Sequence, residues 1–419
     1  MEQNLIEPIV TRSVEDFLRV RHQTETLAKN LSDADATVQS MPDASPAKWH
    51  LAHTSWFFEE FIIAPIRGDD ARIHPDYAFL FNSYYDAVGA RHARPRRGML
   101  TRPSLAEILA YRAAITDQMC TLLTERPEHV LPLLALGLAH EEQHQELLLT
   151  DILHLFAQNP LNPAVYTHET ADETGVKAAA LQWHRHAGGR YAIGHGGDGF
   201  AFDSEGPRHD VLVAPFEIAS RTVTCGEWQN FMAAGGYSQS EYWLSDGFSQ
   251  AQTEGWRAPL YWQEGGDGWT VMTLSGRRAV NPQAPVTHIS FYEADAYARW
   301  SGARLPTEQE WEIATETERP DGHFADRRRY RPQVQSDGAE TYMFGDVWEW
   351  TASPFVAYPG FRPASGAVGE YNGKFMSGQM VLRGGSCVTA AKHMRATYRN
   401  FFGPDKRWQF SGLRLARDL

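Results

Sequence analysis

Apolar residues recur at helical spacing through most of the first 160 residues. Residues 12–31 place apolar side chains on one face and are expected to form a first helix. A second helix is expected to run from Ser45-Pro46, which supplies an N-cap and a first-turn proline, to about Ile63. This part of the chain is therefore predicted to be helical.

Two more helices are expected in the same region. Ser104 is predicted to cap a third helix, and Glu107 three residues later completes a capping box. A fourth is expected from about Glu128 to Phe156, with Pro132 as a candidate break. Four such helices predict a bundle, and the interior of a bundle is a natural place for a metal site.

Beyond residue 180 the pattern changes to short strand-like pieces and one clear helix, from Ser290 to Ser301. Only five of the 34 glycines and two of the 13 tryptophans lie in residues 1–180. Sequence rich in glycine and tryptophan is typical of turns packed on aromatic cores. We therefore expect a helical domain over residues 1–160, a linker over 161–180 and a second domain over 181–419.

Composition and charge exclude several classes of function. Lys and Arg number 39 while Asp and Glu number 52, so the formal net charge is −13. An acidic chain lacks the positive footprint that binding to nucleic acid requires. No apolar run is long enough to cross a bilayer, and the polar, acidic start is unlike a leader peptide. We expect a soluble cytoplasmic protein without nucleic-acid or membrane partners, whose oligomeric state the sequence leaves open.

The segment His140-Glu141-Glu142-Gln143-His144 is the strongest local signal for chemistry. Histidines four residues apart on a helix share a face and can hold one metal ion. The same letters match the H-E-x-x-H pattern of zinc hydrolases, in which the glutamate is the general base. The pattern is loose, and a solvated helix face with no metal is the plainer interpretation.

A third ligand would decide between these interpretations. Trp49-His50-Leu51-Ala52-His53 lies on the second predicted helix, which can face the fourth. Either His50 or His53 could complete a three-histidine site, and spacing leaves both open. A site of three histidines without a carboxylate leaves positions for substrate and for dioxygen or water, and its geometry does not separate iron from zinc.

Tyrosines and arginines follow the second predicted helix. Tyr84 and Tyr85 are adjacent, and near a metal a tyrosine can donate a proton or a hydrogen atom. Four arginines come next, at Arg91, Arg94, Arg96 and Arg97. Against the acidic background they form a local anion site suited to a carboxylate.

Six strings in the second half are specific when they occur together. They are G-R-Y-A-I-G at 189–194, P-V-T-H-I-S at 285–290, G-A-R-L-P-T-E-Q-E-W-E at 302–312, G-D-V-W-E-W-T at 345–351, V-L-R-G-G-S at 381–386 and F-S-G-L-R at 410–414. In this order they resemble the formylglycine-generating-enzyme (sulfatase-modifying-factor) family. The resemblance implies a C-type-lectin-like domain with little regular structure. A non-catalytic lectin-like binding module is one function that such a domain could have.

With the first half included, the chain resembles the ergothioneine-biosynthesis sulfoxide synthase family, EgtB, over nearly its whole length. The resemblance implies an α+β multidomain protein, in which a DinB-like four-helix bundle precedes the formylglycine-generating-enzyme-like domain. The family's ligand motifs fall on Leu51-Ala52-His53 and on His140, His144 and Glu146. This implies iron(II) bound by His53, His140 and His144, so replacing His50 is expected to spare both metal and activity.

The family uses dioxygen to join a thiol sulfur to the imidazole ring of hercynine (Nα-trimethylhistidine), leaving a sulfoxide. One branch carries a catalytic tyrosine two residues before V-L-R-G-G-S, where this chain has Gln379. Tyr84 and Tyr85 are therefore the expected donors, and Arg94 with its neighbours is expected to bind the carboxylate of the thiol substrate. The residues expected to contact hercynine are Gln143, Asn400, Phe401, Phe402 and Trp408.

The thiol is expected to be cysteine. In the branch that uses γ-glutamylcysteine, an R-N pair is followed by Trp and Asp, and the Asp holds the glutamyl ammonium. Here Arg399-Asn400 is followed by Phe401-Phe402-Gly403, so that acidic partner is missing. An unpaired ammonium left in such a pocket costs about 1–3 kcal/mol. We therefore expect cysteine to be favoured over γ-glutamylcysteine.

Overall fold

The structure is a computed structural model and describes residues 3–167, 175–336 and 342–419. Contacts divide the chain into two compact units. The first comprises Met1–Leu161 together with Ser365–Tyr371, and the second comprises Asn162–Ala364 and Asn372–Leu419. Each unit therefore has its own core, and a short piece from the second half of the sequence belongs to the first unit.

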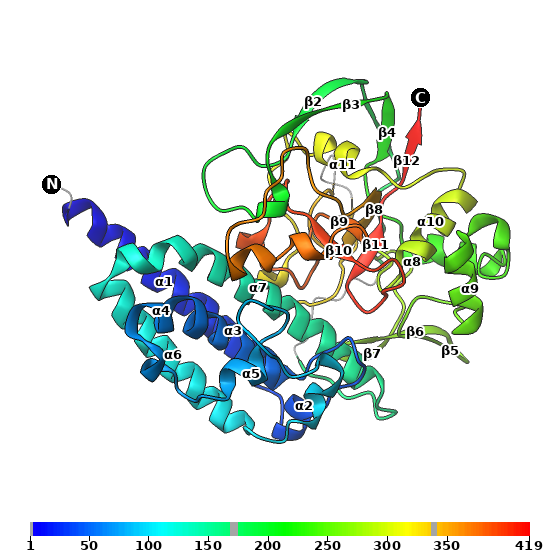
Figure 1. Cartoon of the computed structure of the whole chain (residues 1–419). Helices are drawn as coiled ribbons and strands as arrows, with labels where there is room; N and C mark the ends of the chain where they lie inside the picture. The colour runs from blue at the N-terminus through cyan, green and yellow to red at the C-terminus, as the bar shows by residue number, and fades with distance from the viewer. Residues whose placement is uncertain (1–2, 168–174, 337–341) are drawn as a thin grey trace. The chain divides into compact units, whose positions relative to one another are not determined.

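Four long helices dominate the first unit (Figure 1). They are α1 (Gln3–Ala28), α3 (Ala47–Phe58), α6 (Leu105–Glu125) and α7 (Pro127–Ala157). Shorter helices and turns fill the connections: α2 (Asp33–Thr37), α4 (Ala64–Arg67), α5 (Tyr77–Phe81) and the 3-10 turns at Asp69–Ala71 and Arg94–Met99. Both α6 and α7 pack on α1 and α3, so the expected helical bundle is present.

The helix ends show which local signals decided the structure. Ser104 and Glu107 form the predicted capping box at the start of α6. The helix α7 runs through Pro132 without the expected break. The missing N–H of Pro132 deprives only the Glu128 carbonyl, in the first turn of α7, of its usual partner.

The predicted cap at Ser45 is wrong. Pro46 occupies the N-cap position of α3, and no side chain caps this helix end. The Ser45 N–H instead donates to Asp151 Oδ2 at 2.8 Å, and its hydroxyl accepts from Arg97. At its other end α3 continues as a π-helical turn, Glu59–Ile63, of the kind often found at functional sites.

In its described residues, the second unit contains short strands in four small sheets and long irregular connections. One sheet pairs β1 (Trp183–His186), β4 (Phe216–Ala219) and β12 (Ala416–Asp418), and another orders β10 (Asn400–Phe402), β9 (Met380–Arg383), β8 (Trp348–Pro354) and β11 (Ser411–Leu413). The remaining strands form a hairpin of β2 (Gly189–Ile193) with β3 (His209–Val213), and a meander of β5 (Trp262–Gly265), β6 (Gly268–Thr273) and β7 (Gly276–Ala279).

The α-helices that the structure describes beside these sheets are α8 (Cys225–Ala233), α9 (Ser245–Thr253), α10 (Phe291–Trp300) and α11 (Glu308–Ala314). The helix predicted at Ser290 to Ser301 is confirmed as α10, with Ser290 as its cap and Glu293 completing a capping box. Within the described residues, no helix combines the length and the apolar character needed to cross a bilayer.

Three of the six characteristic strings of the second half meet in the core of the second unit. Glu349 is buried and accepts hydrogen bonds from Trp311 Nε1 at 2.8 Å and from both Arg414 Nε and Nη2 at 2.9 and 2.7 Å. These three residues come from three different strings. A buried charge needs such partners, which explains why this fold depends on so many specific polar residues.

Candidate metal centre

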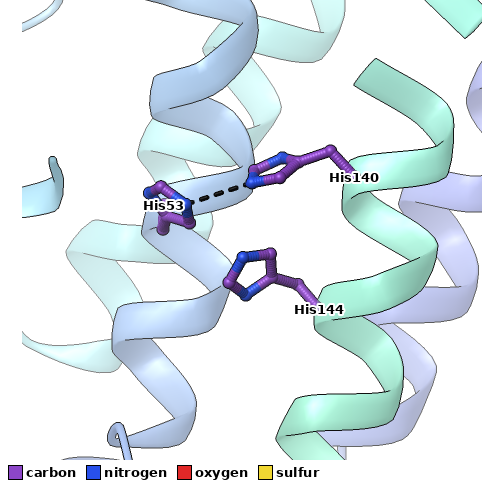
Figure 2. A group of neighbouring side chains, drawn as sticks. All are labelled: His53, His140 and His144. Atoms are coloured by element: carbon purple, nitrogen blue, oxygen red, sulfur yellow. Dashed lines mark hydrogen bonds between the residues drawn. The ribbon is translucent and has the colours of Figure 1, made fainter. Parts of the chain in front are cut away.

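Three buried histidines converge between two helices of the first unit. His53 projects from α3, and His140 and His144 project from successive turns of α7 (Figure 2). Each offers one ring nitrogen, and the three nitrogens all lie within 4.8 Å of one another. The described residues contribute no carboxylate to this cluster.

Hydrogen bonds determine which nitrogen two of these rings present. His53 Nδ1 lies 2.6 Å from the Phe81 carbonyl oxygen, which can only accept, so Nδ1 carries the proton and Nε2 is left as a ligand atom. His140 Nε2 lies 3.1 Å from His53 Nε2. His144 Nδ1 lies 2.9 Å from His50 Nδ1, so its Nε2 is the atom left for a ligand.

The donor set fits a metal ion. Two nitrogens about 2.1 Å from one ion lie about 3.0 Å apart when they meet at a right angle, close to the His53–His140 separation. Burial lowers the pKa of His140 to about 3 and lowers the pKa of His53 and His144 well below 6.5. All three rings are therefore neutral, as ligation requires.

Aromatic rings fix the planes of these histidines. Trp49 stacks on His53 at 4.5 Å between centroids, and Trp56 packs against the same ring at 5.2 Å. Phe57 stacks on His140 at 4.5 Å. The cluster therefore lies in an apolar, rigid surround that strengthens electrostatic interactions with any bound ion.

Glu141 does not serve the metal cluster. Its carboxylate accepts hydrogen bonds from Arg21 at 3.0 Å, Arg112 at 2.8 Å and Thr24 at 2.7 Å. Burial alone would raise the pKa of Glu141, but the two guanidinium groups outweigh it and lower that pKa to about 2. A carboxylate held in this way is a poor base, so the geometry opposes the zinc-hydrolase interpretation.

The predicted tyrosines lie close to the cluster. Tyr85 is fully buried and packs between Tyr84 at 4.6 Å and Trp56 at 5.6 Å. Trp56 in turn packs on His53. The Trp56 ring therefore lies between the Tyr85 ring and the His53 ring and contacts both.

A third tyrosine, Tyr371, was not anticipated from the sequence. Its ring lies 5.8 Å from that of His140 and 6.4 Å from that of Tyr84, and its hydroxyl donates to Gln143 Oε1. Glu370 anchors this segment by accepting from the Asp86 and Ala87 N–H groups, both at 2.9 Å. No local pattern marks a residue so distant in sequence.

The arginine cluster divides by burial. Arg94 is exposed, and Arg91 is paired with Asp86. Arg97 is buried, lies 3.4 Å above the Trp49 ring and donates to Ser45 Oγ. Arg94, the arginine named from the sequence, is thus open to solvent, while Arg97 lies against Trp49 of the histidine-bearing helix α3.

The remaining predicted residues belong to the second unit. Asn400, Phe401 and Phe402 form the edge strand β10. Phe401 stacks on Phe355 at 4.0 Å, and Phe402 lies 6.1 Å from Trp408. Four of the residues predicted to contact hercynine therefore lie on β10 and in the loop that follows it.

Each half of the chain matches a known family of protein domains. Residues 16–148 match the DinB superfamily, and residues 185–342 and 338–419 match the sulfatase-modifying factor enzyme 1-like domain. The predicted fold class, a DinB-like helical domain followed by a formylglycine-generating-enzyme-like domain with sparse strands, is therefore confirmed.

Proteins that are similar over nearly the whole length of the chain show which family it belongs to. The chain is 33% identical to the hercynine oxygenase of Mycobacterium tuberculosis, covering 96% of this chain and 97% of that protein. It is 32% identical to the hercynine oxygenase of Mycolicibacterium thermoresistibile, with 96% and 94% covered. A formylglycine-generating enzyme of Streptomyces coelicolor is 30% identical but covers only 55% of this chain. With its DinB-like helical domain, its sulfatase-modifying-factor-like domain and its buried histidine cluster, the chain belongs to the hercynine oxygenase family of oxidoreductases.

Proposed function

We propose that this chain is an iron(II)-dependent sulfoxide synthase of ergothioneine biosynthesis, which joins a thiol to the imidazole carbon of hercynine. The balanced reaction consumes one thiol, one hercynine and one dioxygen and releases one sulfoxide and one water. Four electrons leave the substrates, two in forming the C–S bond and two in oxidising sulfur, and dioxygen takes up all four.

One observation carries this proposal. A three-histidine cluster without a carboxylate lies buried in a chain whose relatives over the whole length are hercynine oxygenases. Iron(II), when bound there, supplies the one-electron chemistry that lets dioxygen react with a thiol, which zinc cannot do. The apolar rings around the histidines exclude bulk water from the reacting groups.

Residues around the cluster have distinct proposed roles. Tyr84 or Tyr85 delivers a proton or hydrogen atom, and burial raises the pKa of Tyr85 well above 10, so its hydroxyl stays protonated. Gln143, half-buried one residue before His144, offers its amide to hercynine. An arginine of the 91–97 cluster binds the carboxylate of the thiol, and exposed Arg94 is the proposed one.

We further propose that cysteine is the preferred thiol. The edge strand carries Phe402 where an acidic residue would be needed for a glutamyl ammonium. The next carboxylate along the chain, Asp405, is paired with Lys406 at 3.0 Å. A second ammonium would therefore lack a partner on this strand, and such a loss costs about 1–3 kcal/mol. Asn400 and Trp408 remain the proposed partners of the hercynine trimethylammonium end, together with Phe401.

Anaerobic reconstitution tests the reaction. The chain is loaded with iron(II), supplied with hercynine, cysteine and dioxygen, and its product is identified by mass spectrometry. We expect one sulfoxide for each dioxygen consumed, and loss of iron and product in His53→Ala, His140→Ala and His144→Ala. His129→Ala, an exposed histidine near the start of α7, is the matched control and should keep both. Product formation with zinc alone would contradict the proposal.

A competition assay tests the thiol. Equal concentrations of cysteine and γ-glutamylcysteine are offered to the iron-loaded chain, and the two products are counted. We expect about a tenfold or greater excess of the cysteine product, the ratio that corresponds to about 1.4 kcal/mol. An excess of the γ-glutamyl product would contradict the preference and leave the reaction itself standing.

A further inference from the structure

We propose that His50 and Asp151 are positioning residues that hold His144 in the form that binds the metal ion. The inference deepens the proposed function, because it rests on the three-histidine cluster being a metal site. It also revises the expectation that His50 is dispensable.

A continuous chain of hydrogen bonds links the three residues. Asp151 Oδ2 lies 3.0 Å from His50 Nε2, and His50 Nδ1 lies 2.9 Å from His144 Nδ1. All three side chains are buried. These hydrogen bonds therefore connect the Asp151 carboxylate on α7 to the His50 ring on α3, and the His50 ring to the ligand His144 on α7.

The Asp151 carboxylate at the end of this hydrogen-bonded series determines which ring nitrogens of His50 and His144 carry a proton. A carboxylate accepts hydrogen bonds, so His50 Nε2 must donate to Asp151. In the tautomer that donates from Nε2, the His50 ring presents Nδ1 as an acceptor, and His144 Nδ1 donates to it. His144 Nε2 is consequently the nitrogen with a free lone pair, and it is the nitrogen on the far side of the ring from His50.

The far end of the chain is itself held in place. Asp151 Oδ2 also accepts the Ser45 N–H at 2.8 Å, and the Ser45 hydroxyl accepts from the buried Arg97. This explains why Ser45 is recruited away from the helix cap. Partners of this kind orient metal-binding histidines, and their loss typically weakens metal affinity 10- to 100-fold.

The Phe81 carbonyl plays the corresponding part for His53, because it accepts the hydrogen bond from His53 Nδ1. His140 Nδ1 has no hydrogen-bond partner among the described residues, and its ring is held by stacking on Phe57. The His50–Asp151 pair is therefore the only side-chain relay that the described part of the chain supplies to this cluster.

Cobalt(II) binding to the chain of residues 1–419 tests the relay without any turnover. The dissociation constant and the visible ligand-field spectrum are measured for the parent and for His50→Ala, with urea denaturation of the metal-free proteins to confirm folding. We expect His50→Ala to bind cobalt(II) 10- to 100-fold more weakly with an altered spectrum. His154→Ala, which removes a half-buried α7 histidine bonded to Ser40, is the matched control and should match the parent.

Two conservative variants separate positioning from packing. His50→Asn can keep an acceptor near the Nδ1 position, which faces His144, whereas His50→Gln can keep only the contact near Nε2, which faces Asp151. If the acceptor to His144 matters, Asn should restore affinity and spectrum better than Gln. If His50 only fills space, the larger Gln side chain should restore them better, and that result would overturn the proposal.

The remaining outcomes are also decisive. Equal cobalt(II) affinity and identical spectra in the parent and His50→Ala would overturn the relay while leaving the metal site intact. A parent chain that binds no cobalt(II) at this cluster would overturn both the relay and the metal site on which the proposed function rests.

Discussion

Glu141 carries its charge inside the bundle, between the Arg21 and Arg112 guanidinium groups. Replacing it by Gln leaves two buried cations facing a neutral amide. We expect Glu141→Gln to lower the free energy of unfolding at pH 7 by about 3 kcal/mol, measured by urea denaturation. Metal binding and turnover of the folded fraction should persist, because this carboxylate is engaged away from the cluster. A well-folded, iron-loaded variant without turnover would contradict that assignment.

The same residue predicts a pH dependence. The pKa of Glu141 is lowered from 4.5 to about 2, so the native state favours its charged form. Its contribution to stability is complete above about pH 4.5 and is lost as the pH falls from there towards 2. The parent should therefore lose more stability than Glu141→Gln over this range. Parallel stability curves for the two proteins would show that the guanidinium groups do not stabilise the charge.

The tyrosine pair allows a test of proton delivery. Replacing Tyr84 and Tyr85 by Phe keeps the stacked rings and removes only the hydroxyl groups. We expect the double variant to form sulfoxide more slowly and to divert dioxygen to simple thiol oxidation, quantified as the ratio of the two products. Tyr77→Phe, in the same unit but packed on Phe81 and Tyr111, is the control. An unchanged product ratio would remove the pair from the mechanism.

Local sequence revealed some of these residues and could not reveal others. His140 and His144 share a helix face at fixed spacing, so the pattern alone marked them, whereas the choice between His50 and His53 required the family resemblance. The burial of Arg97, the bond between His50 and His144 and the approach of Tyr371 to Gln143 depend on contacts between distant segments. No spacing rule encodes such contacts.

Among the elements, α3 and α7 determine the geometry of the metal centre. Gly137 lies on α7 one turn before His140, where an added Cβ would come within 2.5 Å of the Phe58 ring on α3. The absence of a side chain therefore lets the two ligand-bearing helices approach closely.

Gly137→Ala should separate these helices. Alanine favours helix formation by about 1 kcal/mol, but overpacking a filled core costs about 1–3 kcal/mol. We expect no net gain in stability and a weaker cobalt(II) affinity, because His53 and His140 move apart. The double variant Gly137→Ala/Phe58→Leu makes room for the new methyl group and should recover metal binding. Tighter binding in the single variant would contradict this account.

Element boundaries were predictable where a single turn decides them. The capping box of α6 uses residues three apart and was predicted from the sequence, and the helix α10 was predicted to begin at Ser290, which is its cap. Ser45 failed as a cap because Asp151 and Arg97, far along the chain, take its hydrogen bonds. The irregular second unit gave few periodic signals, since its strands are short and its core depends on buried ion pairs.

At the scale of the whole molecule, the two units are not consecutive in sequence. Ser365–Tyr371 belongs to the helical unit, although the segments on either side of it belong to the other. A chain of residues 1–161 keeps all three histidines and loses Glu370 and Tyr371. We expect this fragment to be helical by circular dichroism and to bind cobalt(II), but to form no sulfoxide with iron(II), both substrates and dioxygen. Full turnover by the fragment would show that the second unit is unnecessary.

The placement of the ligands on two helices has a thermodynamic consequence. His53 and His140 are 87 residues apart, so an ion bound by both acts as a reversible crosslink between α3 and α7. An ion that binds the folded chain alone stabilises it by about 2.7 kcal/mol when its free concentration is a hundred times the dissociation constant. The melting temperature should thus rise with the concentration of free metal and fall on chelation. Heat resistance then becomes a gauge of how fully the protein is loaded, readable before any substrate is added.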